Sequence, residues 1–97
     1  MDLYEEQKAL LATLVEVMND INGLLKAEGD DLIRYQGLQK IKNIAKNNDP
    51  HGVGKLPTYL VGLEHVIMDN RLLTMPIKRK LEQAQSILLK IERLSED

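Results

Sequence analysis

The sequence contains no cysteine, no tryptophan and no phenylalanine, and its only aromatic residues are three tyrosines. Without cysteine, neither a disulfide framework nor a thiolate metal site can form, which suits a reducing compartment. A core without large aromatic rings has to be built from Leu, Ile, Val, Met and Ala, and this favours packed helices over a sheet sandwich. A run of eighteen apolar residues is found nowhere in the chain, so we expect no membrane insertion.

Length and charge set the next limits. A chain of 97 residues suits a single domain over residues 1–97 with one core. The net charge is −2, and it is unevenly spread. The first thirty residues carry seven acidic and two basic side chains, whereas the remainder carries eight acidic and eleven basic ones. The acidic start does not resemble a secretory signal, so the sequence predicts a cytoplasmic protein.

Apolar residues recur at three- and four-residue steps along most of the chain. In the first such stripe, at positions 3, 7, 10, 14, 17, 21 and 24, only Gln7 is polar. The spacing predicts amphipathic helices over residues 2–27, 31–47, 57–70 and 75–94. Four helices with short connections indicate an all-α fold, an antiparallel up-down four-helix bundle. The core residues predicted for its second half are Leu60, Leu63, Ile67, Leu81 and Leu88.

Glycine, proline and short polar residues predict where these helices begin and end. Gly23 lowers helix stability, so the first helix is expected to fray or end near it, and Gly29 is a good left-handed cap. Asp30 or Asp31 is the expected N-cap of the second helix. Residues 47–54 contain one proline and two glycines, which predict the longest and most mobile loop of the chain.

The second half of the chain has the clearest signals for where helices begin and end. Pro57 opens the third predicted helix, and Thr74 is the strongest N-cap signal, with Pro76 just inside the last helix. Between these two helices the chain reverses around Arg71, and the apolar residues at 72 and 73 are expected to tuck under the turn.

Motifs for phosphate or metal binding are weak. The stretch Gly52–Lys55 is only partly similar to a phosphate-binding loop, because Asp49 and Leu56 occupy places that need glycine and Ser or Thr. His51 and His65 take part in neither a His-x-x-x-His nor a Glu-x-x-His spacing, the helical patterns typical of metal sites. We therefore expect no cofactor and no metal.

Catalysis and nucleic-acid binding are also disfavoured. Ser86 and Ser95 lie on or after a predicted helix surface, where a nucleophile would have no strained turn or pocket, so we expect no enzyme. The predicted second helix carries a basic cluster, but it follows an acidic loop in an acidic chain, and we expect no nucleic-acid partner. The cluster consists of Lys40, Lys42 and Lys46.

The stretch from Leu56 to Leu94 resembles the bacteriocin immunity proteins of the enterocin A immunity type, which act against class IIa, pediocin-like peptides. The resemblance implies a four-helix bundle of about this length that confers antimicrobial peptide resistance. It implies a cytoplasmic protein, peripheral at the inner membrane face, that binds a membrane sugar-transport permease carrying the bacteriocin and performs no catalysis. The residues that carry the resemblance are Leu56, Pro57, Leu60, Leu63, Ile67, Thr74, Leu81 and Leu88.

The candidate partner-binding surface is the polar side of the last predicted helix. Its basic side chains are suited to acidic loops of a partner, because arginine pairs well with carboxylates. The alternative is a generic helical protein–protein interaction module of phage or plasmid origin that acts as a dimer; the sequence fits a monomer or a weak dimer. The candidate surface residues are Arg79, Gln83, Lys90 and Arg93.

Overall fold

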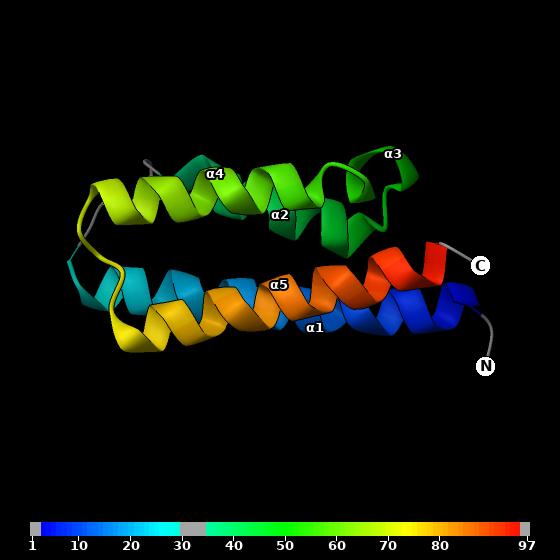
Figure 1. The fold of residues 1–97 in the computed structure, drawn as a ribbon, viewed down its shortest axis with the longest axis horizontal. Helices are drawn as coiled ribbons and strands as arrows, with labels where there is room; N and C mark the ends of the chain where they lie inside the picture. Colours follow the sequence, from blue (N-terminus) through cyan, green and yellow to red (C-terminus); the bar gives the residue numbers. More distant parts are fainter. Residues whose placement is uncertain (1–2, 30–34, 96–97) are drawn as a thin grey trace.

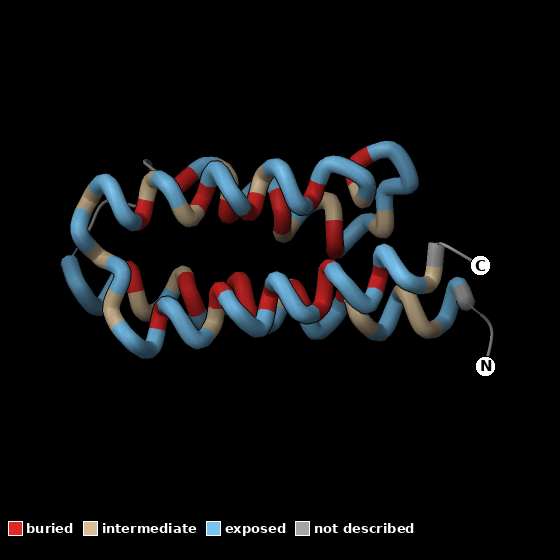
Figure 2. Tube along the Cα trace, viewed as in Figure 1, coloured by how far each residue is buried: buried red, intermediate tan, exposed pale blue. Residues whose placement is uncertain are grey.

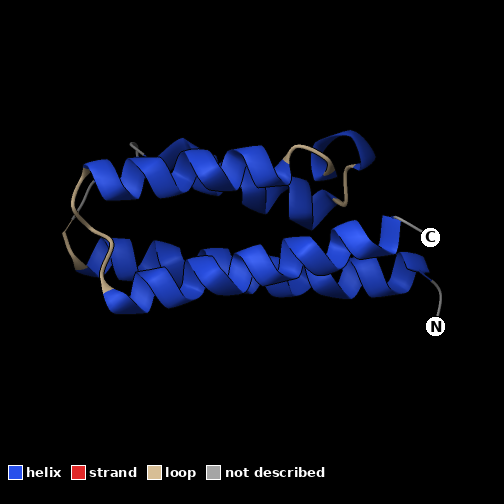
Figure 3. Cartoon of the chain, viewed as in Figure 1, coloured by secondary structure: helices blue, strands red, loops and turns tan. Residues whose placement is uncertain are grey.

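A computed structural model of the chain describes residues 3–29 and 35–95, and every regular element within them is a helix (Figure 3). Four helices are long and one is a single turn. The all-α class and the four main helices predicted from the sequence are confirmed. The helices are α1 (Leu3–Ala27), α2 (Gln36–Asn47), α3 (Pro50–Val53), α4 (Leu56–Asp69) and α5 (Met75–Ser95).

The long helices form an elongated antiparallel bundle of 41 × 22 × 18 Å (Figure 1). Going around the bundle, α1 packs against α2, α2 against α4, α4 against α5, and α5 against α1. The α1–α5 contact is the most extensive of these and the α4–α5 contact is the least. The start of α1, the end of α5 and the short helix α3 lie at one end, and the α4–α5 turn lies at the other.

The core is entirely aliphatic apart from Tyr35, and it runs along the inward faces of the four long helices (Figure 2). All described buried side-chain nitrogen and oxygen atoms have a hydrogen-bond partner. Burial of this surface is the main source of stability, at roughly 25 cal/mol for each Å² removed from water. The five core residues predicted for the second half are all buried: Leu60, Leu63, Ile67, Leu81 and Leu88.

Helix α1 contributes the longest buried stripe and continues through Gly23 to Ala27. The expectation that it frays or ends near Gly23 is wrong. The glycine is exposed, while Ile21 and Leu25 on either side of it are fully buried, so packing offsets the local cost of about 1 kcal/mol. Gly29 has a φ of +77°, which confirms the predicted left-handed residue after this helix.

The only polar position in the predicted stripe of α1 has a specific partner. The Gln7 side-chain amide donates to Asn48 Oδ1 at 2.9 Å, across a partly buried contact between residues 41 apart in sequence. Asn48 also ends α2, in the left-handed conformation with a φ of +47°. Asparagine tolerates this conformation better than most residues do. A single residue thus ends one helix and contacts another.

The predicted start of the second helix lies largely outside the described residues, which include neither Asp30, Asp31 nor Leu32. Tyr35, which was placed inside that helix, lies directly before α2 and makes no capping hydrogen bond with its side chain. Its ring is instead buried in the core.

The prediction of an irregular loop over residues 47–54 is wrong, because Pro50–Val53 forms α3. Asp49 caps this turn, with its side chain accepting from the backbone N–H of His51 at 3.1 Å, and Pro50 follows at the first helical position. Gly52 is buried directly against Ile44 of α2. An Asp-Pro pair is a helix-start signal, and here it outweighs the two glycines.

The α4–α5 connection is a Schellman turn. Arg71 has a φ of +59°, its N–H donates to the Met68 carbonyl at 2.9 Å, and the Leu72 N–H donates to the Ile67 carbonyl at 3.0 Å. Leu72 packs against the core as expected, but Leu73 does not tuck under the turn and is 40% exposed.

Helix α5 follows that turn directly. The Thr74 carbonyl accepts from the N–H of Lys78 at 2.9 Å, which is the first turn of the helix, and Pro76 is its second residue. Proline is well tolerated there because the first four N–H groups of a helix have no intrahelical acceptor.

The two glycines around α3 provide a matched test of this packing. A Cβ on Gly52 would lie 2.8 Å from two carbons of Ile44, whereas one on Gly54 would meet nothing within 4 Å, and Gly54 has a φ of −66°. We expect Gly52→Ala to reduce the free energy of unfolding in urea by about 1–3 kcal/mol. Gly54→Ala should raise it by roughly 0.4–1 kcal/mol. Equal stability of the two variants would contradict the packing of α3 on α2.

Candidate binding surfaces

The four residues selected from the sequence are all exposed on α5. Their spacing of four, seven and three residues places them on one side of the helix. Among the described residues, none of the four takes part in an ion pair or a side-chain hydrogen bond, so their polar groups are available to a partner. We call this set the basic stripe: Arg79, Gln83, Lys90 and Arg93.

One end of the basic stripe borders α1. Arg79 and Gln83 line an open hollow together with Asp20 and Gly23 of α1. Beside it, Lys80 Nζ lies 2.9 Å from Asp20 Oδ2, and both side chains are partly exposed. A surface pair of this kind contributes at most about 1 kcal/mol, so it positions α5 against α1 more than it stabilises the fold.

A second surface lies between α4 and α5, where the two helices make their thinnest contact. Two open hollows follow one another along this seam, of about 180 and 290 Å³. Buried leucines at positions 60, 81 and 88 line them, and exposed apolar side chains stand beside those leucines. The exposed residues are Val61, Met68, Leu73 and Leu89, and we call this surface the α4–α5 groove.

Polar groups cross and edge this groove. Glu64 of α4 accepts a hydrogen bond from the side-chain amide of Gln85 on α5, and both residues line both hollows. Glu82 and Lys78 line the hollow near the α4–α5 turn, and Glu92 lines the other. The lining therefore holds three carboxylates and one ammonium group.

The sequence analysis does not predict the groove. Val61, Met68 and Leu89 are not among the predicted core residues or the predicted surface residues, and they are 52%, 56% and 55% exposed. The available signal was an excess of apolar residues in α4, which exceed what one inward stripe requires. Such an excess on a helix of a small bundle points either to deeper burial or to an uncovered surface.

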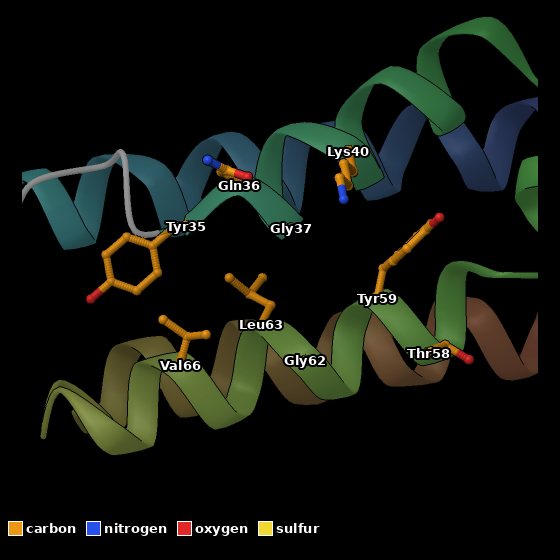
Figure 4. A pocket seen from close by; sticks show the side chains of 9 residues that line it. All are labelled: Tyr35, Gln36, Gly37, Lys40, Thr58, Tyr59, Gly62, Leu63 and Val66. Carbon is orange, nitrogen blue, oxygen red and sulfur yellow. The ribbon is translucent and has the colours of Figure 1, made fainter.

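A fourth hollow, of about 490 Å³, lies between α2 and α4 (Figure 4). Glycines stand on both of its walls, Gly37 on α2 and Gly62 on α4. At one end the Lys40 ammonium lies 5.6 Å from the centre of the Tyr59 ring, a cation–π contact. A Cβ on Gly37 would lie 3.6 Å from the Tyr59 carbonyl, so the helices approach closely here.

The remaining sequence motifs do not converge on a site. Gly52 is buried within α3, and Lys55 is exposed directly before α4, so the partial phosphate-loop motif presents no glycine-rich loop. His51 and His65 lie exposed on different helices, and within the described ranges no three His, Asp or Glu side chains gather in a group that could hold a metal ion. Ser86 is exposed on α5.

Comparisons of the chain with protein-family models, with curated proteins and with solved structures find no match. Across residues 3–29 and 35–95, no helix combines the length and the apolar character needed to cross a membrane. The functional argument therefore depends on the surfaces of the bundle, and two of these share helix α5.

Adjacent leucines on α5 test where the core ends and the groove begins. Leu88 is 9% exposed and Leu89 is 55% exposed. We expect Leu88→Ala to lower the free energy of unfolding by about 2–3 kcal/mol, since it leaves a cavity beneath the groove. Leu89→Ala should change it by less than about 0.5 kcal/mol. Denaturation followed by circular dichroism measures both, and a large loss from Leu89→Ala would show that this side chain belongs to the core.

Proposed function

We propose that this protein is a bacteriocin immunity protein that acts by binding and performs no catalysis. The observation that carries the proposal is the resemblance of residues 56–94 to the enterocin A immunity type. Support comes from the coincidence of that stretch with α4 and α5, the helix pair on which both the basic stripe and the α4–α5 groove lie. An all-α bundle of this size is also the fold that the resemblance implies.

In this proposal, the basic stripe recognises the inner side of a sugar-transport permease that has bound a pediocin-like peptide. Arginine offers a planar fork of donors that matches a carboxylate, so Arg79 and Arg93 are suited to acidic loops of such a partner. Binding holds the peptide-bound permease in a state that does not open a pore. The protein then works at the cytoplasmic membrane face without entering the bilayer.

A generic helical interaction module that acts as a dimer is the second candidate. The exposed apolar surface of the α4–α5 groove favours an interaction module in general, since uncovered patches of this kind mark interaction sites, and it does not specify a second copy as the partner. Sedimentation at high concentration separates the candidates: a strictly monomeric protein leaves the dimer without support.

Protection of a sensitive bacterium is the direct test. Expression of the chain in a sensitive lactic-acid bacterium should raise the lethal concentration of at least one class IIa bacteriocin by an order of magnitude or more. An empty vector and an unrelated pore-forming peptide serve as controls. Unchanged killing across a panel of class IIa peptides would reject the proposed function.

Charge reversal tests the basic stripe. The double variant Arg79→Glu with Arg93→Glu should lose protection, because like charges would then face an acidic partner. Lys8→Glu with Lys46→Glu is the matched control, since both lysines are exposed on other helices and the net charge changes equally. Full protection by a folded stripe variant, with a circular dichroism spectrum like that of the parent, would exclude this surface.

A further inference from the structure

We infer that the α4–α5 groove is a docking site for a basic amphipathic helix of another protein. This inference concerns a surface different from the basic stripe and does not depend on bacteriocin immunity. Three properties of the groove point to such a partner: its apolar exposure, its dimensions and the sign of its charge.

Four of the six large apolar residues that are exposed in the described part of the chain lie on this seam, and the other two are Tyr4 and Met75. Val61, Met68, Leu73 and Leu89, which are between 40% and 56% exposed, all line its two hollows. Buried leucines form the surface beneath them, so a side chain entering either hollow meets apolar atoms on several sides. An amphipathic helix laid in a groove uses this kind of surface, with anchors at every third or fourth residue. Met68 adds a flexible side chain that can adapt to the anchors.

The two hollows have the spacing of anchors on a helix. One lies around Val61 and the other around Met68, and seven residues of α4 separate these positions. At a rise of 1.5 Å per residue this separation is about 10 Å, which two anchors seven residues apart on a partner helix would match. The hydrogen bond between Glu64 and Gln85 stands between the hollows and would lie between the two anchors.

The charge of the groove is opposite to that of the neighbouring stripe. Glu64, Glu82 and Glu92 line it, with Lys78 as the one base among its lining residues. On the adjacent side of α5 the charged residues are Arg79, Lys90 and Arg93. A partner helix with lysine or arginine flanking its apolar side would place those bases against the groove carboxylates, which favours association and sets orientation.

Other occupants fit the groove less well. A second copy in a symmetric dimer would bring the same three carboxylates of each chain around one apolar seam, and like charges there oppose association. The two hollows lie at or below the lower end of the roughly 300–1,000 Å³ of typical small-molecule pockets, and both are open along the seam. A helix that spans both hollows is the occupant that uses the entire surface.

A synthetic peptide tests the inference on the full chain. The probe is a peptide of about 14 residues, long enough to span the groove at 1.5 Å per residue, with leucine at every third or fourth position and lysine elsewhere. A second peptide replaces each lysine with glutamate. Fluorescence anisotropy should show binding of the lysine peptide and no binding of the glutamate peptide. Failure of the lysine peptide to bind would overturn the inference.

Apolar variants test whether binding occurs in the groove. Met68→Ser with Leu89→Ser should weaken binding of the lysine peptide about tenfold or more, because both anchor contacts lose apolar surface. Tyr4→Ser is the matched control: Tyr4 is 57% exposed on α1, away from the groove, and its variant should bind within about twofold of the parent. Equal weakening by both sets would show general adhesion and overturn the site.

Charge variants test whether the carboxylates of the groove contribute to peptide binding. Glu82→Gln with Glu92→Gln should weaken binding several-fold at low salt and flatten its salt dependence. Glu5→Gln with Glu16→Gln on α1 changes the net charge equally and should leave binding unchanged. A larger effect from the α1 pair would place the peptide on the acidic N-terminal helix instead.

Sedimentation tests the alternative of a second copy. If the protein forms a dimer that Leu89→Ser dissociates, the groove binds a second copy, which also overturns the inference.

These outcomes are independent of the protection assay. If the chain gives no protection but binds the lysine peptide, the proposed function alone is rejected. If it protects but does not bind the peptide, the docking site in the groove alone is rejected.

Discussion

Burial of the apolar face of α1 is the interaction on which the rest of the bundle depends. This helix is the longest, packs against both α2 and α5, and contributes several of the most deeply buried side chains, including Leu14, Met18 and Ile21. Because the core lacks large aromatic rings except Tyr35, close packing of branched aliphatic chains has to supply most of the burial. Where that packing is thinnest, between α4 and α5, apolar surface stays in contact with water. The candidate groove is therefore a direct product of how the core is distributed.

Helix periodicity made most of this fold predictable, because the stripes of all four long helices are regular and their ends carry strong signals. The left-handed conformation of Gly29 and the burial of the five predicted core residues from Leu60 to Leu88 are both confirmed. The failures have local causes. At Pro50–Val53 two glycines obscured an Asp-Pro helix start, and the reason for Gly52 is visible only once Ile44 is placed against it. At Leu73 the apolar character gave no indication of direction, since that depends on the left-handed turn at Arg71.

The candidate surfaces differ in how far sequence could reach them. The basic stripe follows from helical spacing alone, and the structure places all four of its residues outward on α5. Helical spacing alone predicts that Leu88 faces inward, as the structure confirms. The α4–α5 groove depends in addition on how closely two helices approach and on whether a neighbour covers Leu89, and neither is encoded in a local pattern. One helix thus carries a basic side and an acidic, apolar side, which gives the bundle two chemically distinct faces along a single axis.

The contact between Gln7 and Asn48 gives the bundle an axial reference. Aliphatic stripes with a three- and four-residue repeat pack almost as well after one helix slides along another by one turn, about 5.4 Å. Such stripes therefore specify the axial register of two helices poorly. A partly buried amide pair has one satisfied alignment, and sliding α1 by a turn would leave both groups without each other. Because Asn48 also terminates α2, the same residue fixes where that helix ends and the axial position of α1 beside it. Asn48 therefore sets the alignment of α1 and α2 along the bundle axis in addition to ending α2.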